Sequence, residues 1–256
     1  MRVIEGVSHL TVAVADLDAA AQSYTALLGV ASRRFVDADG RPAAWFDCAN
    51  LAFVLAAADE RHAAGLEALA FRVADLGRAA RGLARCGLAV GDAVEAVGPD
   101  ARWREAALAP AAAHGLPLRL ADAPAPSGAG LALDHVVIRT PNPERAVALY
   151  GGRLGLDMRL DRANPAWDAR LLFFRCGDTV VELAHVLSKG VSDRPDAFGG
   201  LSWRVPDIDA THERLTQAGF TLSPVRTGRR ANSRVCTVRD GTAGVPTILL
   251  GLDPAA

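Results

Sequence analysis

The 256-residue sequence has few of the features that mark common functional classes. Lys189 is its only lysine, so the 28 basic residues are almost all arginine, as in proteins from GC-rich bacterial genomes. The formal net charge of -1 argues against a nucleic-acid or membrane-surface partner. No apolar run approaches the roughly 20 residues that span a bilayer, and the first residues turn polar too early for a signal peptide. We therefore expect a cytoplasmic protein with a small-molecule ligand.

The four cysteines lack any pairing pattern. They stand far apart and without a CxxC spacing, so neither a zinc knuckle nor a redox motif is indicated; they are Cys48, Cys86, Cys176 and Cys236. A Gly-rich phosphate loop, a nucleophile-elbow serine and a dinucleotide fingerprint are also missing from the sequence. Half of the residues are hydrophobic, which is ample for a buried core. The sequence thus predicts a globular domain without a common cofactor motif.

The most informative feature of the sequence is an internal repeat. SHLTVAVADLDAAAQSYTALLGV, from Ser8, aligns with DHVVIRTPNPERAVALYGGRLGL, from Asp134, so that His9 matches His135. A second pair is LAFRVADLGRAARGLARCGLAV, from Leu69, and LSWRVPDIDATHERLTQAGFTL, from Leu201. In each segment an alternating apolar strand leads through an N-cap residue into an amphipathic helix that stops at a glycine. The caps are Asp16, Asp75, Asn142 and Asp207, and the glycines are Gly29, Gly87, Gly155 and Gly219.

About three short strand candidates follow each helix, so the repeat predicts four βαβββ units. The Pro-, Gly- and Ala-rich stretch ADAPAPSGAG, from Ala121, lacks periodicity and is interpreted as a linker. We expect an α+β fold with an N-terminal domain over residues 1–121, a linker over 122–130 and a C-terminal domain over 131–256. Each domain would contain two units.

These segments resemble the vicinal oxygen chelate superfamily, which includes glyoxalase I, bleomycin-resistance proteins, methylmalonyl-CoA epimerase and extradiol dioxygenases. The resemblance rests on HLTVAVADLDAAAQSYTALLG, DHVVIRTPNPERAVALYGGRLG and VVEL from Val180, and it covers nearly the whole chain. It implies that two units pair into a cup-shaped open barrel, so four units make two cups. Pairing within each half and pairing across halves both occur in this superfamily. Two complete cups are compatible with a monomer or a homodimer.

The resemblance also implies a divalent metal ion held by the first and last strands of the paired units. The first-strand positions are His9, Ala68, His135 and Gly200, and the last-strand positions are approximately Leu55, Arg119, Glu182 and Ile248. Only the third unit offers two donors, His135 and Glu182, which suit a divalent ion. Neither the second nor the fourth unit adds a third donor, whereas catalytic sites generally use three. The metal set is therefore incomplete, the cofactor is left unknown, and the first unit is interpreted as having lost its site.

Two functions fit this reading. The first is a lyase- or isomerase-type enzyme acting on a small oxygenated organic molecule, with His135 and Glu182 as acid–base residues. The predicted substrate-binding residues are Arg119, Arg139, Trp167, Phe198, Ser202 and Arg204. Extradiol dioxygenase chemistry is disfavoured because Gly200 and Ile248 stand where it needs ligands. The second function is a metal-free binding protein that sequesters an antibiotic or senses a small molecule, with His135 bonded to Glu182 as a remnant and the arginines forming rim ion pairs.

Overall fold

A computed structural model describes residues 3–252 and contains two eight-stranded mixed sheets. The strand order of the first sheet is β2-β3-β4-β1-β5-β8-β7-β6, and that of the second is β10-β11-β12-β9-β13-β16-β15-β14. The first sheet consists of β1 (Ile4–Val14), β2 (Arg33–Val36), β3 (Pro42–Asp47), β4 (Ala52–Ala57), β5 (Gly65–Val73), β6 (Val94–Val97), β7 (Arg102–Ala107) and β8 (Leu118–Ala121). The second consists of β9 (Ala132–Arg139), β10 (Asp157–Asn164), β11 (Ala169–Cys176), β12 (Thr179–Val186), β13 (Ala197–Val205), β14 (Arg226–Thr227), β15 (Ser233–Val238) and β16 (Thr247–Leu252).

The strand order shows which units pair. In each sheet the first strands of two consecutive units lie side by side and run antiparallel, β1 with β5 and β9 with β13. Each of these strands also pairs in parallel with the last strand of its own unit, for example β9 with β12. The first and second units therefore make one cup and the third and fourth make the other. The predicted α+β architecture of two cup-shaped sheets is confirmed, and the pairing that the sequence left open is within halves.

The helices begin and end where the sequence predicts. They are α1 (Leu17–Leu28), α2 (Leu76–Arg85), α3 (Pro143–Ala146) and α4 (Ile208–Gln217). Every predicted N-cap side chain accepts a hydrogen bond from a backbone N–H of the first turn. The four predicted terminal glycines all have φ between 69° and 91°, which only glycine adopts without strain. One detail differs, because α3 continues as a wider π-helix, η1 (Val147–Arg153).

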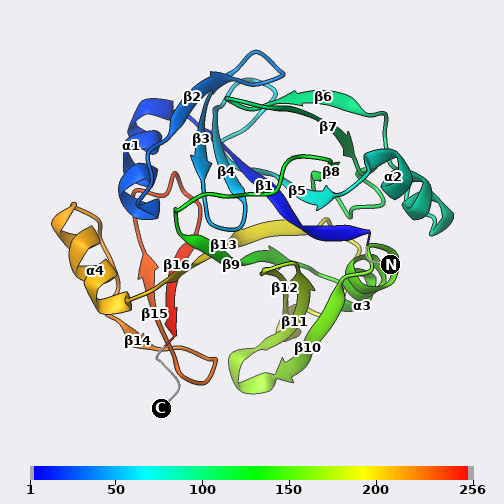
Figure 1. The fold of residues 1–256 in the computed structure, drawn as a ribbon. Coiled ribbons are helices and arrows are strands. Elements are labelled where there is room, and N and C mark those ends of the chain that lie inside the picture. The colour runs from blue at the N-terminus through cyan, green and yellow to red at the C-terminus, as the bar shows by residue number, and fades with distance from the viewer. Residues whose placement is uncertain (1–2, 253–256) are drawn as a thin grey trace.

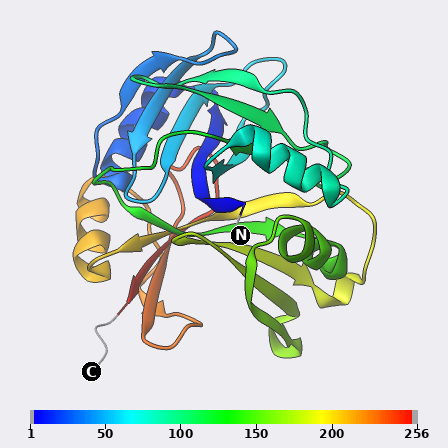
Figure 2. The ribbon, with the colours of Figure 1, turned by 45° about the vertical axis from the view of Figure 1, so that its right-hand side comes forward.

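The two sheets lie back to back, and their concave faces point away from each other (Figure 1). Helices α1 and α4 flank this double layer on one side, and α2 and α3 flank it on the other (Figures 1 and 2). A single cluster of buried apolar side chains takes in residues of both halves, and the Phe53 ring meets the Trp203 ring edge-on at 5.6 Å. The halves thus share one core. Among residues 3–252, no helix is long and apolar enough to cross a membrane.

Polar contacts tie the halves together across this core. The Asn50 side chain accepts from the backbone N–H of Leu133 at 2.9 Å and donates to the Leu133 carbonyl oxygen at 2.8 Å. It therefore satisfies both backbone groups of a β9 residue, as a neighbouring strand would. Arg214 of α4 donates to the carbonyl oxygen of Ala26 in α1. These contacts fix the position of one cup relative to the other.

Tyr24 and Tyr150 occupy matching repeat positions but differ in hydrogen bonding. The buried Tyr24 Oη donates to the Thr242 carbonyl oxygen at 3.0 Å, whereas the buried Tyr150 Oη has no partner among the described residues. We expect Tyr24→Phe to lower the free energy of unfolding by about 1 kcal/mol, because a buried carbonyl loses its donor. Tyr150→Phe should leave that free energy unchanged or raise it. Urea denaturation of both variants checks this, and equal losses would contradict it.

Candidate functional site

The floor of the C-terminal cup is built by strands β9, β12, β13 and β16. Val136 and Ile138 of β9 lie fully buried in the core. Because side chains alternate along a strand, His135 and Val137 face the cup. Strand β12 runs parallel to β9 with Glu182 opposite Val137 and Val180 opposite His135. Leu183 and its odd-numbered neighbours point into the core, which leaves Glu182 on the cup face. Regular alternation on two paired strands thus brings His135 and Glu182 together.

His135 and Glu182 belong to a row of four ionisable side chains that continues through Asp134 to Arg204. His135 Nε2 lies 3.4 Å from Glu182 Oε2, and His135 Nδ1 lies 2.9 Å from Asp134 Oδ2. Asp134 Oδ1 lies 3.5 Å from Nε of Arg204, which also donates to Asp178 at 2.6 Å. The register of β9 against β13 shifts between Ser202 and Trp203. This bulge places the adjacent side chains of Asp134 and His135 on the same side of the strand.

Burial and neighbouring charges shift the pKa values of the two carboxyl groups that flank His135, those of Glu182 and Asp134. The pKa of Glu182 is raised chiefly by desolvation, while His135 and Arg229 act in the opposite direction. The pKa of Asp134 is lowered because desolvation is outweighed by its hydrogen bond to His135 and by the charge of that ring. Two carboxyl groups therefore flank one imidazole with opposite tendencies. Asp134 stays ionised and orients the ring, while Glu182 has an increased affinity for a proton.

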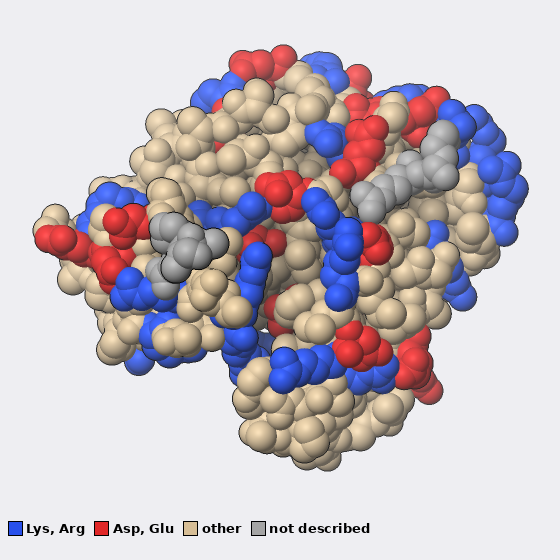
Figure 3. All heavy atoms as spheres, turned by 60° about the horizontal axis from the view of Figure 1, so that its bottom comes forward, with Lys and Arg blue, Asp and Glu red and all other residues tan. Residues whose placement is uncertain are grey.

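The rim of the C-terminal cup is basic and carries one exposed aromatic ring. The Trp167 ring, which is 39% exposed, lies beneath two guanidinium groups, with Arg229 4.6 Å and Arg162 5.4 Å from its centroid. Arg139 is exposed at the end of β9, on the same face as His135. Figure 3 shows Lys and Arg side chains gathered around a hollow in which acidic side chains are visible. The rim is suited to anions.

The structure places three predicted substrate-binding residues elsewhere or out of reach. Arg119 lies on β8 in the N-terminal cup and pairs with Glu105, so it does not join His135. Phe198 packs against the common core, because a bulge between Phe198 and Gly200 reverses the alternation of β13. Ser202 lies opposite His135 but is fully buried, and its Oγ has no hydrogen-bond partner among the described residues. The other three predicted substrate-binding residues do lie around the C-terminal cup; they are Arg139, Trp167 and Arg204.

The N-terminal cup contains a second histidine–glutamate pair that the sequence reading missed. His9 Nε2 lies 3.2 Å from Oε1 of Glu105 on β7, and both side chains are buried. Trp103 donates to the same carboxylate at 2.6 Å, and Arg119 donates to it at 3.3 Å. Glu105 belongs to the second unit, so only the unit pairing could have identified it. The expected counterpart of Glu182, Leu55, instead faces the core, and Val54 lines the cup.

The donor set does not fit the metal ion that the resemblance implies. Between residues 3 and 252, no group of three or more His, Cys, Asp or Glu side chains is placed to hold a metal. Gly200 has φ of 146°, and a Cβ there would lie 2.4 Å from the Pro246 carbonyl oxygen, so a histidine ligand cannot replace it without moving the backbone. Ile248 carries no donor, and Asp134 faces the Nδ1 side of His135, away from Nε2. We therefore derive no step through a metal.

The raised pKa of Glu182 predicts a pH-dependent effect of Glu182→Gln on stability. Near pH 4 the carboxyl is largely protonated in the folded and unfolded chains, so its desolvation costs little. As the pH rises from the unfolded pKa through the higher folded pKa, the folded state loses stability. The substitution should therefore change the free energy of unfolding more favourably near pH 7 than near pH 4. Urea denaturation at both pH values tests this, with the exposed Glu213→Gln as control; a pH-independent difference would refute it.

Comparison with known proteins gives the family. Residues 6–105 and residues 134–237 each match the Glyoxalase/Bleomycin resistance protein/Dioxygenase superfamily. The ethylmalonyl-CoA/methylmalonyl-CoA epimerase of Cereibacter sphaeroides is 31% identical over 94 residues, covering 34% of this chain and 70% of that protein.

Two solved structures share the whole tandem fold. A mutant of 4-hydroxymandelate synthase from Streptomyces coelicolor superposes with a TM-score of 0.75 at 14% identity, covering 99% of this chain and 94% of that chain. The Mn(II)-bound glyoxalase from Novosphingobium aromaticivorans gives a TM-score of 0.71 at 16% identity, covering 99% of this chain and 84% of that chain. These likenesses show the fold, and the two family matches, which cover most of the sequence, show that the chain belongs to the Glyoxalase/Bleomycin resistance protein/Dioxygenase superfamily, the vicinal oxygen chelate proteins, in tandem form.

Proposed function

We propose that the protein is an isomerase- or lyase-type enzyme that removes a proton beside a carbonyl group of a small oxygenated organic anion. The reaction would take place in the C-terminal cup. The observation that supports this most is the chain Asp134–His135–Glu182, in which an ionised carboxylate orients an imidazole against a carboxyl group whose pKa is raised. General acid–base catalysis is most effective when the pKa of the base approaches the working pH.

Glu182 is the proposed base. Its carboxylate takes the proton from the carbon, and the electron pair of the broken C–H bond moves onto the carbonyl oxygen to form an enolate. His135, held through Nδ1 by Asp134, exchanges a proton with Glu182 through Nε2 at 3.4 Å. An isomerase then returns a proton to the enolate carbon, whereas a lyase expels a leaving group from the neighbouring carbon. Both outcomes balance without an oxidant or reductant.

The rim supports an anionic substrate. Arg139 and Arg229 are placed to attract a carboxylate or phosphate, and guanidinium groups bind such anions through paired N–H donors. Trp167 between Arg162 and Arg229 adds a flat apolar surface at the entrance. The epimerase relative is named for two CoA thioesters that carry a carboxylate. Acyl-CoA compounds of that kind are therefore the first substrates to test.

Proton exchange from the substrate carbon into deuterated water tests the proposal directly. With methylmalonyl-CoA or a related acyl thioester, wild-type protein should incorporate deuterium at the carbon beside the carbonyl, as detected by mass spectrometry. Glu182→Gln and His135→Ala should each lower the rate by about 100-fold or more, the usual contribution of a general base. Glu213→Gln, an exposed substitution of the same type on α4, should exchange at the wild-type rate. Saturable binding of these anions without any exchange would instead support the binding-protein alternative.

Asp134 is proposed as a positioning residue. We expect Asp134→Asn to lower kcat by about 10-fold or more, because the residue that orients the His135 ring is lost, with little change in KM. The substitution replaces the carboxylate beside His135 Nδ1 with an amide, so the ring loses the acceptor that orients it, and the conservative Asp134→Glu should restore part of the lost kcat. Equal losses of kcat in Asp134→Asn and Asp134→Glu, or a rise in KM that parallels the loss of kcat, would contradict this positioning role.

A further inference from the structure

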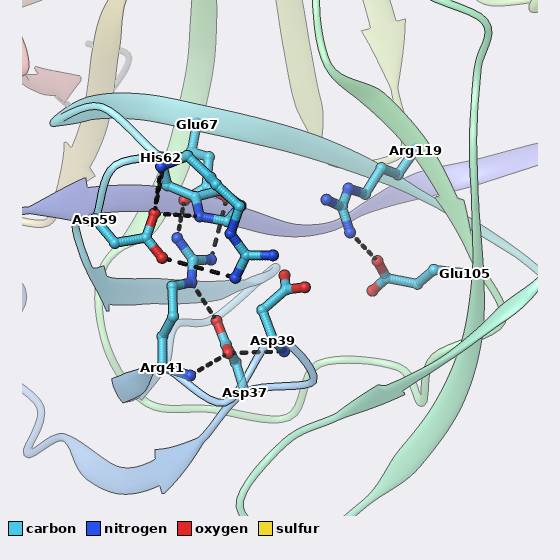
Figure 4. A network of polar contacts seen from close by, with 9 residues as sticks. Asp37, Asp39, Arg41, Asp59, His62, Glu67, Glu105 and Arg119 are labelled. Carbon is cyan, nitrogen blue, oxygen red and sulfur yellow. Dashed lines mark hydrogen bonds and ion pairs between the residues drawn. The ribbon is translucent and has the colours of Figure 1, made fainter.

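The N-terminal cup contains an open cavity of about 80 Å³ that the proposed reaction does not use. Because one water molecule takes up about 10–15 Å³ of a cavity volume measured in this way, the cavity holds roughly five to eight water-sized groups. Its walls come from all eight strands of the first sheet and from the turn between β2 and β3. Figure 4 shows Asp37, Arg41 and Glu67 together on one side and Glu105 with Arg119 on the other. The cavity has the size of a small metabolite.

Aromatic rings line one wall of this cavity at steep angles to one another. Phe35 meets Trp45 edge-on, with ring centroids 6.1 Å apart at 79°, and Trp45 lies 5.7 Å from Trp103 at 59°. The His9 ring meets Trp103 edge-on at 5.9 Å. All four rings are among the lining residues. Rings at steep angles to one another can turn more than one ring face toward a single occupant, and the face is the electron-rich side of an aromatic ring.

The charged lining of the cavity is negative overall. Four carboxylates line it, those of Asp37, Asp39, Glu67 and Glu105, against the two guanidinium groups of Arg41 and Arg119. Arg41 is already held by Glu67 through two hydrogen bonds of 3.0 and 3.1 Å and by Asp37 at 2.9 Å, while Arg119 donates to Glu105.

His9 adds no positive charge at neutral pH. Its pKa is lowered, chiefly by burial, and the attraction of Glu105 only partly offsets this shift. Two negative charges are therefore left over in an aromatic-walled cavity.

We propose that the N-terminal cup binds a small organic cation of the methylated ammonium class. Such a cation is attracted by ring faces and by carboxylates together, and its methyl groups fill apolar space that a metal ion would leave empty. An anion would meet the surplus negative charge. This site lies in the other cup from His135 and Glu182, and it stands whether or not the proposed reaction is correct.

Choline and its uncharged isostere 3,3-dimethyl-1-butanol test the proposal. Trp45 and Trp103 are two of the four tryptophans, so titration of intrinsic fluorescence, backed by calorimetry, reports occupancy of the cavity. Choline should bind saturably, and the uncharged isostere should bind at least about 10-fold more weakly because it lacks the cation–π and carboxylate attraction. Equal affinities for the two compounds, or no saturable binding of choline in the millimolar range, would overturn the proposal.

Three variants locate the site. Trp45→Leu should weaken choline binding by roughly 2- to 30-fold, the range of a cation–π contact. Asp39 is exposed on the β2–β3 turn, and Asp39→Asn removes one lining charge without breaking either guanidinium pair. It should weaken choline binding a few-fold and leave the isostere unaffected. Trp167→Leu, in the other cup, should bind choline like wild type. If Asp39→Asn and a folded Trp45→Leu both retain wild-type affinity, the assignment is wrong.

Discussion

The whole molecule depends on four central strands whose two faces have different surroundings. Each of the central strands β1, β5, β9 and β13 buries one side in the common core and exposes the other to a cup, with Leu10 and Val12 on the core side of β1 and His9 and Thr11 on the cup side. Because successive side chains of a strand alternate, core packing decides which residues reach a cup. A site residue is therefore held in place by the apolar neighbours on either side of it, and a slip of one residue would exchange core and site.

The same scaffold position supports two different polar arrangements. His9 and His135 are repeat equivalents, yet His135 meets Glu182 from the last strand of its own unit, while His9 meets Glu105 from a strand of the neighbouring unit. Burial acts on different partners in the two cups, raising the pKa of Glu182 in one and lowering that of His9 in the other. The surrounding charge differs as well, since a basic rim surrounds one cup and surplus carboxylates line the other. The repeated architecture thus leaves the electrostatics of each cup free to differ.

The sequence predicts this fold well because its signals are local and repeated four times. The caps Asp16, Asp75, Asn142 and Asp207 and their partner glycines define the helices, and the repeat then implies the sheets. His135 and Glu182 could be placed together because both stand on regular strands of one unit.

The remaining site residues depend on information that single-sequence patterns lack. The pairing of the units was needed to identify Glu105 as the partner of His9 and Arg119 as a partner of Glu105. Phe198 and Asp134 are oriented by bulges that interrupt the alternation of β13 and β9. A bulge inserts one extra residue and shifts every later side chain by one position. Glycine inside a strand pattern is a local signal for a bulge, and Gly199 and Gly200 mark the first of these two, whereas no such signal marks the bulge at Asp134.

Asn50 ties the two halves of the chain into one structure. Its amide group completes the hydrogen bonding of Leu133 in the other half, at the edge of a core that neither half closes alone. A duplicated unit that is packed in this way cannot be discarded when its own chemistry is lost, since its removal would expose the apolar back of the surviving cup. One cup can then accumulate changes in its lining while selection on the other preserves its backbone. Tandem copies that share a core can in this way retain a pocket long enough for it to acquire a different ligand.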